Sequence, residues 1–263
     1  MLRGVAQPRE RRPLAVANPS DQFIVKTLVP LRIGGLDLGF TNASLMMVLA
    51  TAAIAGGLIL ATRSRAIVPS RAQALAEMLY EFVAKTLTDA TGREGMRFLP
   101  LIFSLFMFVL VLNLFGMIPG AFTVTSHIVV TFALAMLVMA TVVGYGVLRH
   151  GFGFLRLFVP SDVPKWLLPF ITLIEIVSFL SRPISLSLRL FANLLGGHIA
   201  LKVFGSFVAA LLAAGVSTSL LAPLPLLMTV ALTAFEFMVA VLQAYVFTVL
   251  ACIYLNDALH PGH

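Results

Sequence analysis

Three polar side chains interrupt one apolar stretch of this chain. The segment Ser187–Ile199, SLRLFANLLGGHI, contains Arg189, Asn193 and His198. An arginine keeps its proton in proteins, so it supplies a fixed positive charge that attracts carboxylates and repels protons. An imidazole titrates near pH 6.5 and can pass a proton on. Together these residue types indicate the handling of protons in apolar surroundings.

At helical spacing, the surrounding segment carries a stripe of polar residues on one face. Successive members of the stripe are three or four residues apart, and they are Glu175, Ser178, Arg182, Ser185, Arg189 and Asn193. At 1.5 Å per residue, it is about 27 Å long. His198 falls on the opposite face, with Lys202 one turn beyond it. Serine hydroxyls also bond back to their own helix, and Arg182 and Lys202 suit a structural role equally well, so these positions stay open.

The composition shows which elements must position these residues. Of the 263 residues, 60% are hydrophobic and 11% are charged, whereas soluble domains are about 45–50% apolar and roughly 25% charged. The chain is therefore predicted to be an integral membrane protein. Its net charge of +7 fits basic cytoplasmic loops better than nucleic-acid binding. The single cysteine, Cys252, lies in an apolar run and excludes a disulfide within the chain.

Within a membrane, Arg189 becomes an expensive residue. A charge at the bilayer centre costs about 2.5–3.5 kcal/mol on insertion scales. Glu175 is fourteen residues away on the same helix, roughly 21 Å along its axis. We therefore expect the counter-charge of Arg189 on the neighbouring helix or on another protein. The next apolar segment carries Glu236 and Gln243 on one face and Asp257 further on.

The apolar segments predict an all-α polytopic membrane protein with about five membrane-embedded helices. They cover residues 43–62, 99–118, 126–148, 167–212 and 223–256. Residues 69–89 are amphipathic at helical spacing, so we expect them to lie on the membrane surface or against a partner. Residues 1–42 are expected to form an extracytoplasmic N-terminal segment, and residues 43–263 a single membrane domain.

The last two apolar segments are too long to cross a membrane upright. The 46 residues of 167–212 would extend about 69 Å as a helix, against a hydrocarbon core of about 30 Å. Pro183 and the pair Gly196 and Gly197 are positions where a helix bends at low cost. We expect a long, strongly tilted helical hairpin rather than four short helices.

The basic residues predict how the chain is oriented. Five crossings place loops 63–98 and 149–165 on one side, and the turns on the other side hold no basic residue. The loop cations are Arg63, Arg65, Arg71, Lys85, Arg93, Arg97, Arg149, Arg156 and Lys165. The positive-inside rule then places the N-terminus in the periplasm and the C-terminus in the cytoplasm. The arginine-rich N-terminal tail argues the other way, but the two loops agree with each other.

Four sequence motifs resemble the subunit a family of F-type ATP synthases. They are PISLSLRLFANLLGGH, FEFMVAVLQAYVFTVLACIYL, NLFGMIPG with Asn113 and Pro119, and LVPLRIGGLDLGFTNASL. The resemblance covers residues 22–256, and the combination of Arg189 and Asn193 with Gln243 downstream is its most specific part. The histidine and acid at 198 and 236 are arranged as in the mitochondrial and alphaproteobacterial members.

The resemblance implies a membrane stator that faces a rotating ring of c subunits. Arg189 matches the family arginine that faces the carboxylate of the ring, and Asn193 and Gln243 match the polar residues beside it. The implied activity is proton translocation through two offset half-channels, coupled to ring rotation and ATP synthesis. The chain alone would not be an enzyme, and it has no GxxxxGK[ST] nucleotide-binding loop.

The remaining candidates divide between the two half-channels that the resemblance implies. His198 and Glu236 match the pair that lines the half-channel open to the periplasm. Glu175 and Asp257 match acids near the cytoplasmic half-channel, and Ser178 lies beside that path. Structural hydrogen bonding is the alternative role for His198 and Glu236.

The expected partners are the c-ring, the b-type subunits of the peripheral stalk, the rest of the F0F1 complex and membrane lipids, without nucleic acid. No cofactor and no metal are expected. The expected location is the bacterial plasma (inner) membrane, with the mitochondrial inner membrane as the alternative. A haem-binding redox subunit and an independent secondary transporter are the rival classes, and the five histidines show no helical pairing for haem.

Overall fold

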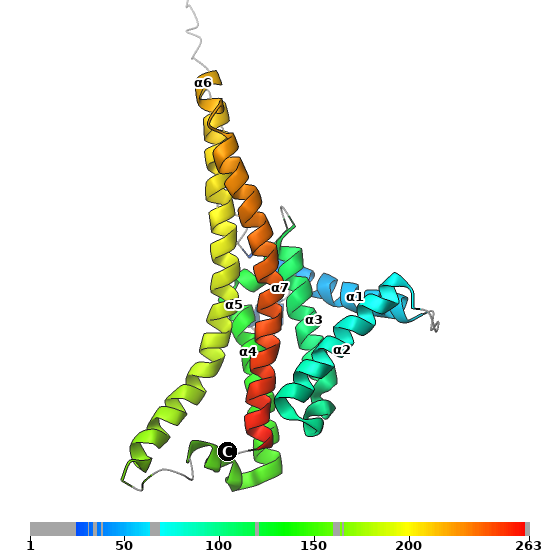
Figure 1. The fold of residues 1–263 in the computed structure, drawn as a ribbon, viewed down its shortest axis with the longest axis vertical. Coiled ribbons are helices and arrows are strands. Elements are labelled where there is room, and N and C mark those ends of the chain that lie inside the picture. The colour runs from blue at the N-terminus through cyan, green and yellow to red at the C-terminus, as the bar shows by residue number, and fades with distance from the viewer. Residues whose placement is uncertain are drawn as a thin grey trace, which may run out of the picture.

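The computed structural model describes residues 25–30, 32–33, 36–37, 39–63, 69–118, 121–159, 164 and 166–260. The arginine-rich tail singled out above falls within residues 1–24, and Arg65 and Lys165 are also among the positions outside the described residues. Within the described part, helices account for nearly all of the structure (Figure 1), which confirms the predicted all-α class.

In the part of the chain that the structure describes, six long helices and one short helix form the body of the protein. They are α1 (Asn42–Thr62), α2 (Arg71–Thr91), α3 (Leu99–Gly116), α4 (Ile128–His150), α5 (Leu168–Ala213), α6 (Val216–Ser219) and α7 (Pro223–Leu259). Within the described ranges they are connected by the 3-10 helices η2 (Arg93–Phe98), η3 (Val124–Ser126) and η4 (Gly151–Phe158). In the described residues, five helices are long and apolar enough to cross a membrane, and α2 is not among them.

Short strands precede the first helix. They are β1 (Thr27–Val29), β2 (Arg32–Ile33), β3 (Leu36–Asp37) and β4 (Phe40–Thr41). β1 pairs antiparallel with β4, and β2 pairs antiparallel with β3. The β4 strand leads directly into α1, where the Thr41 hydroxyl caps the helix by accepting a hydrogen bond from the backbone N–H of Ser44.

Local sequence signals account for the bounds of α2. Ser70 accepts a hydrogen bond from the backbone N–H of Gln73 at 3.3 Å, and this cap starts the helix at Arg71 rather than at residue 69. Gly92 ends it with a φ of 66°, a conformation that glycine adopts without a steric penalty. The chain then turns through η2 into α3, which begins at Leu99 with Pro100 in its first turn.

The long hairpin consists of α5 and α7, joined at its tip by α6 (Figure 1). α5 is one helix of 46 residues with Pro183 inside it. Its N-terminal part leans away from α7 in Figure 1, as expected where a proline removes a backbone hydrogen bond. The tip of the hairpin extends beyond the other helices, whereas α1 runs across the long axis of the hairpin.

The core of the protein forms around α7, which packs against α2, α3, α4 and α5. Small residues on α7 are fully buried at these contacts, namely Ala240, Ala244, Ala251, Cys252 and Ala258. Small side chains let helix backbones approach closely, which is how membrane helices gain packing energy. Cys252 is thus a packing residue, as its apolar sequence context indicates.

Candidate functional site

Arg189 lies on the outer face of α5. The leucines at positions 186, 190 and 194 are fully buried against the core, so the same helix turns its polar stripe outward. Arg189 is exposed, and no described residue forms an ion pair or hydrogen bond with its guanidinium. Of the two expected sources of a counter-charge, the neighbouring helix therefore supplies none in the described structure.

One turn beyond Arg189, an amide pair joins α5 to α7. Asn193 Nδ2 donates a hydrogen bond to Gln243 Oε1 at 2.9 Å. Asn193 is exposed, whereas Gln243 is 3% exposed. The Nε2 of Gln243 is buried without a hydrogen-bond partner among the described residues. The fold thus brings these two residues together beside Arg189 and leaves donor capacity at that point.

His198 of α5 and Glu236 of α7 meet inside the protein, further toward the hairpin tip than the amide pair. His198 Nδ1 lies 3.4 Å from Glu236 Oε1, and both residues are buried. The two carboxyl oxygens of Glu236 accept no hydrogen bond within the described structure. The other ring nitrogen of His198, Nε2, lies 3.3 Å from the hydroxyl oxygen of Thr123. This arrangement can receive and pass on a proton.

Two residues that contact this pair are not among the candidates from the sequence. Thr123 comes from the connection between α3 and α4, in a TVTS turn whose polar residues are buried. Gly197 makes the room for Glu236, because a Cβ atom at position 197 would lie 2.7 Å from Oε1. The only sequence signal for Thr123 is its place in an uncharged turn, and the sequence of Gly196 and Gly197 indicates only a bending point.

Arg182 and Asp257 form an ion pair that links α5 to the C-terminal end of α7. Arg182 Nη1 lies 2.6 Å from Asp257 Oδ2. The guanidinium also stacks over the rings of Phe179, at 5.4 Å, and Tyr254, at 5.0 Å. Glu175 and Ser178 do not join this pair, since neither side chain has a hydrogen bond or ion pair within the described ranges.

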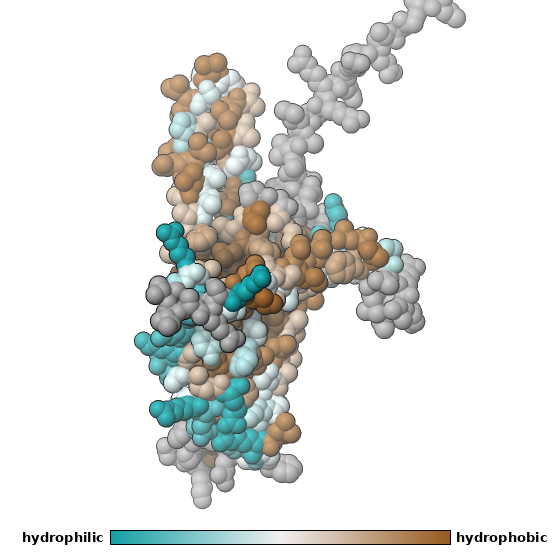
Figure 2. Space-filling view, turned by 90° about the vertical axis from the view of Figure 1, so that its right-hand side faces the viewer, coloured by the Kyte–Doolittle hydropathy of each residue, from teal (hydrophilic) through white to brown (hydrophobic). Residues whose placement is uncertain are grey.

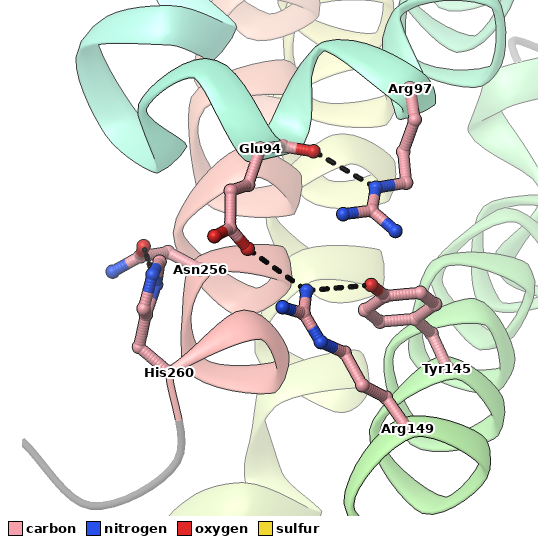
Figure 3. Close-up of polar contacts among 6 residues, drawn as sticks. All are labelled: Glu94, Arg97, Tyr145, Arg149, Asn256 and His260. Atoms are coloured by element: carbon pink, nitrogen blue, oxygen red, sulfur yellow. Dashed lines mark hydrogen bonds and ion pairs between the residues drawn. The ribbon is translucent and has the colours of Figure 1, made fainter.

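A second polar cluster gathers at the same end of α7 (Figure 3). Arg149 Nη1 binds Glu94 Oε2 at 2.9 Å and donates to the hydroxyl of Tyr145 at 2.9 Å. Arg97 Nε donates to the backbone oxygen of Glu94 at 3.0 Å, and His260 points into the same region (Figure 3). Arg97 and Arg149, which belong to the two predicted basic loops, thus meet at one end of the molecule, where Figure 2 shows hydrophilic side chains.

Buried hydrogen bonds connect α3 and α4 to the two helices that carry the candidate residues, α7 and α5. Asn113 Nδ2 donates to the backbone oxygen of Ala240 at 3.0 Å, which ties α3 to α7 between Glu236 and Gln243. Thr131 and Ser187 share a hydrogen bond of 3.2 Å between α4 and α5. Among the described residues, no three His, Cys, Asp or Glu side chains are grouped to hold a metal ion.

Comparison with known proteins finds related sequences over almost the whole chain. The family described as ATP synthase A chain matches residues 44–256. The chain is 64% identical to ATP synthase subunit a of Chelativorans sp. (strain BNC1) over 246 residues, which cover 94% of this chain and 99% of that protein. It is 62% identical to ATP synthase subunit a of Rhizobium johnstonii, over 94% of this chain and 98% of that protein. The chain therefore belongs to the ATP synthase subunit a family.

Proposed function

We propose that this chain is the proton-translocating stator of the F0 sector and that it provides two offset half-channels to a ring of c subunits. The observation that carries the proposal is the exposed Arg189, for which the described chain offers no counter-charge. A fixed positive charge at membrane depth needs an acidic partner. A ring carboxylate that passes over the outer face of α5 meets this requirement.

The first half-channel uses the buried group on the inner face of α5. A proton that enters from the periplasm reaches His198 and Glu236, and then the amides of Asn193 and Gln243. From there it neutralises a carboxylate of the ring. The 3.4 Å contact within the first pair and the 2.9 Å contact within the second support a polar path from the α3–α4 connection toward the outer face of α5.

The second half-channel lies toward the end of α7. After the ring turns, a proton leaves toward the cytoplasm past Glu175, Ser178 and Asp257. The ion pair of Asp257 with Arg182 gives this carboxylate a structural role as well. We therefore place Glu175 and Ser178 on the path itself and Asp257 at its mouth.

Arg189 lies between the two groups and keeps each passing carboxylate ionised. It cannot lose its proton, so it relays none and blocks a direct path between the half-channels. A proton that crosses a potential of 100 mV releases about 2.3 kcal/mol. A leak past Arg189 would dissipate this free energy without turning the ring.

The lengths of the helices support a hairpin that lies along the membrane. α1 has 21 residues and is about 31 Å long, which matches the hydrocarbon core, whereas the 46 residues of α5 extend about 69 Å. α1 runs across the hairpin (Figure 1). If α1 spans the bilayer, the hairpin is strongly tilted and presents its outer face to the ring.

Arg97 and Arg149 lie at one end of the molecule, and such cations support a cytoplasmic location for that end. The N-terminal segment, residues 1–42, would then lie in the periplasm. Residues 43–263 would form the membrane domain. The proposed location is the bacterial inner membrane. The chain would act within the F0F1 complex beside the c-ring, the b-type subunits and lipids. Nucleotide chemistry would belong to other subunits, so this chain would not be catalytic alone.

The test is Arg189→Ala in inverted membrane vesicles that contain the whole complex. ATP-driven acidification and passive proton leak through the membrane sector are recorded separately. We expect acidification to be abolished and passive leak to increase, because the half-channels are no longer kept apart. Arg71→Ala, at the exposed start of α2, is the control and should leave both unchanged. Normal coupled pumping by Arg189→Ala would refute the proposal.

A further inference from the structure

His198 is held between two partners that lie on opposite sides of its ring. Nδ1 lies 3.4 Å from Glu236 Oε1 of α7, and Nε2 lies 3.3 Å from the hydroxyl oxygen of Thr123 in the α3–α4 connection. A neutral imidazole has one donor and one acceptor nitrogen, and the hydrogen bond at one nitrogen sets the state of the other. The Thr123 contact therefore bears on what His198 offers to Glu236.

Thr123 is itself fixed in place by its surroundings. Its backbone oxygen accepts hydrogen bonds from Ser126, from the backbone N–H at 3.3 Å and from the hydroxyl at 2.6 Å. Its Cγ2 methyl packs so closely on α3 that a Cβ atom at Gly116 would lie 2.8 Å from it. Thr123 is 1% exposed. A buried side chain anchored on both sides can orient a neighbouring ring.

We propose that Thr123 is a positioning residue for His198 and that its hydroxyl supports both tautomers of the imidazole. A hydroxyl can donate and accept, so it suits either form of Nε2. With Glu236 ionised, Nδ1–H faces the carboxylate and Nε2 accepts from the Thr123 hydroxyl. With Glu236 protonated, Nδ1 is the acceptor and Nε2–H donates to Thr123. The inference rests on the proposed function of the His198 and Glu236 pair.

The proton balance of the step follows from these two states. A proton binds to Nε2, and the proton on Nδ1 moves to Glu236 Oε1. The imidazole is then neutral again, in its other tautomer, and Glu236 carries one proton more. A side chain that could only accept, or only donate, at Nε2 would stabilise one tautomer and oppose this exchange.

Other ionisable groups near His198 contribute to the electrostatic potential at its ring. Lys202 lies one turn further on α5, and its positive charge acts on His198. Glu236 faces it from α7. The α3–α4 connection holds His127, whose ring stacks on Phe122 with 4.9 Å between ring centroids. The hydroxyl of Thr123 is uncharged, so removing it leaves all of these charges in place. Its removal therefore tests the hydrogen bond to His198 alone.

The test compares Thr123→Val with Thr123→Ser in the whole complex. Valine keeps the shape of threonine but lacks the hydroxyl, whereas serine keeps the hydroxyl. Passive proton conduction through the membrane sector is measured as the pH on the entry side is varied. We expect Thr123→Val to reduce conduction roughly fivefold, as the loss of one hydrogen bond of about 1 kcal/mol implies. The conduction profile should also move to lower pH, because protonated His198 loses an acceptor, and Thr123→Ser should behave as the parent.

Unchanged conduction and pH profile in Thr123→Val would overturn the inference, as would an equal defect in both variants. His198→Ala separates this result from a failure of the proposed function. If His198→Ala abolishes conduction while Thr123→Val does not alter it, the proposed function stands and only the role of Thr123 fails. If His198→Ala conducts normally, the proposed entry path itself is wrong.

Discussion

At the scale of single residues, the position of the buried Glu236 carboxyl group depends on the absence of a side chain at Gly197. Gly197 faces Glu236, and a Cβ atom there would lie 2.7 Å from Oε1, 3.0 Å from Cδ and 3.2 Å from Cγ. The carboxyl group therefore rests against the bare backbone of α5. Glycine in a helix interior costs about 1 kcal/mol relative to alanine, so its use here is explained by the space that Glu236 needs.

We predict that Gly197→Ala reduces proton pumping on the order of tenfold without unfolding the protein. The added methyl displaces the end of a flexible side chain, which costs little stability but moves Glu236 away from His198, and misplaced groups lose rate steeply. The measurement is ATP-driven acidification in inverted vesicles, with the assembly of the complex checked in native gels.

Gly205→Ala is the matched control for that change. It lies on the same helix, and a Cβ atom at position 205 meets nothing within 4 Å. The gain in helix propensity is the same, so Gly205→Ala should pump normally. Equal losses in both variants would show that α5 needs flexible glycines, and the contact with Glu236 would then not explain the effect.

At the scale of elements, the two hairpin helices are held together where they begin to diverge. Towards the C-terminal end of α7, α5 leans away from it (Figure 1), and Arg182 and Asp257 connect the two helices at 2.6 Å. Their side chains are 17% and 27% exposed. A partly buried and charge-assisted hydrogen bond is stronger than a surface pair, so this contact is expected to stabilise the hairpin.

A double-mutant cycle on this pair is expected to show a coupling free energy of about 1 kcal/mol. Asp257→Asn and Arg182→Gln should each lower the thermal stability of the complex in mild detergent. The double variant should then be more stable than the sum of the two effects predicts, because neither charge is left unpaired. The measurement is the temperature of half-inactivation.

The pair of Arg149 and Glu94 is the control for this cycle. Its atoms are 2.9 Å apart, but the side chains are 36% and 50% exposed. Solvent screens such a pair, so its coupling should be small. If the two cycles give equal coupling, burial does not distinguish the pairs, and the link between α5 and α7 contributes no more than a surface contact.

At the scale of the whole molecule, the helices form a body with a hairpin tip that projects beyond it. Figure 2 shows hydrophobic residues over this tip and hydrophilic ones toward the opposite end. The polar stripe of α5 lies on the outside, with Ser178, Ser185, Arg189 and Asn193 all exposed. An outward polar stripe on a membrane helix is costly unless another protein covers it.

We predict that a cysteine introduced at Ser185 forms a disulfide with a cysteine placed on a c subunit of the proposed ring. The native Cys252 is fully buried and is first replaced by alanine. Leu148→Cys on α4, at a position that is 88% exposed, serves as control and should not react with the ring. Oxidation of membranes followed by gel electrophoresis reports the cross-link. Reaction from position 148 but not from 185 would place the ring on another face.

The sequence by itself determined the fold class, the approximate helix ranges and the identity of most candidate residues. Hydrophobic length and helical periodicity are local properties, so Arg189, Asn193 and the hairpin could be predicted from spacing. The cap at Ser70 and the 3-10 turn at Val124–Ser126 shifted the helix starts by two residues, since such ends depend on local hydrogen bonds.

Only the tertiary structure decided which residues meet across helices. Thr123 and His198 are 75 positions apart, and so are Arg182 and Asp257. No periodicity along one helix can reveal such contacts, because they depend on how α3, α5 and α7 pack. The role of Gly197, which is to leave space for the carboxyl group of Glu236, likewise follows only from the contact between α5 and α7. Residue types thus indicated the chemistry, whereas the packing of the helices arranged the groups that could perform it.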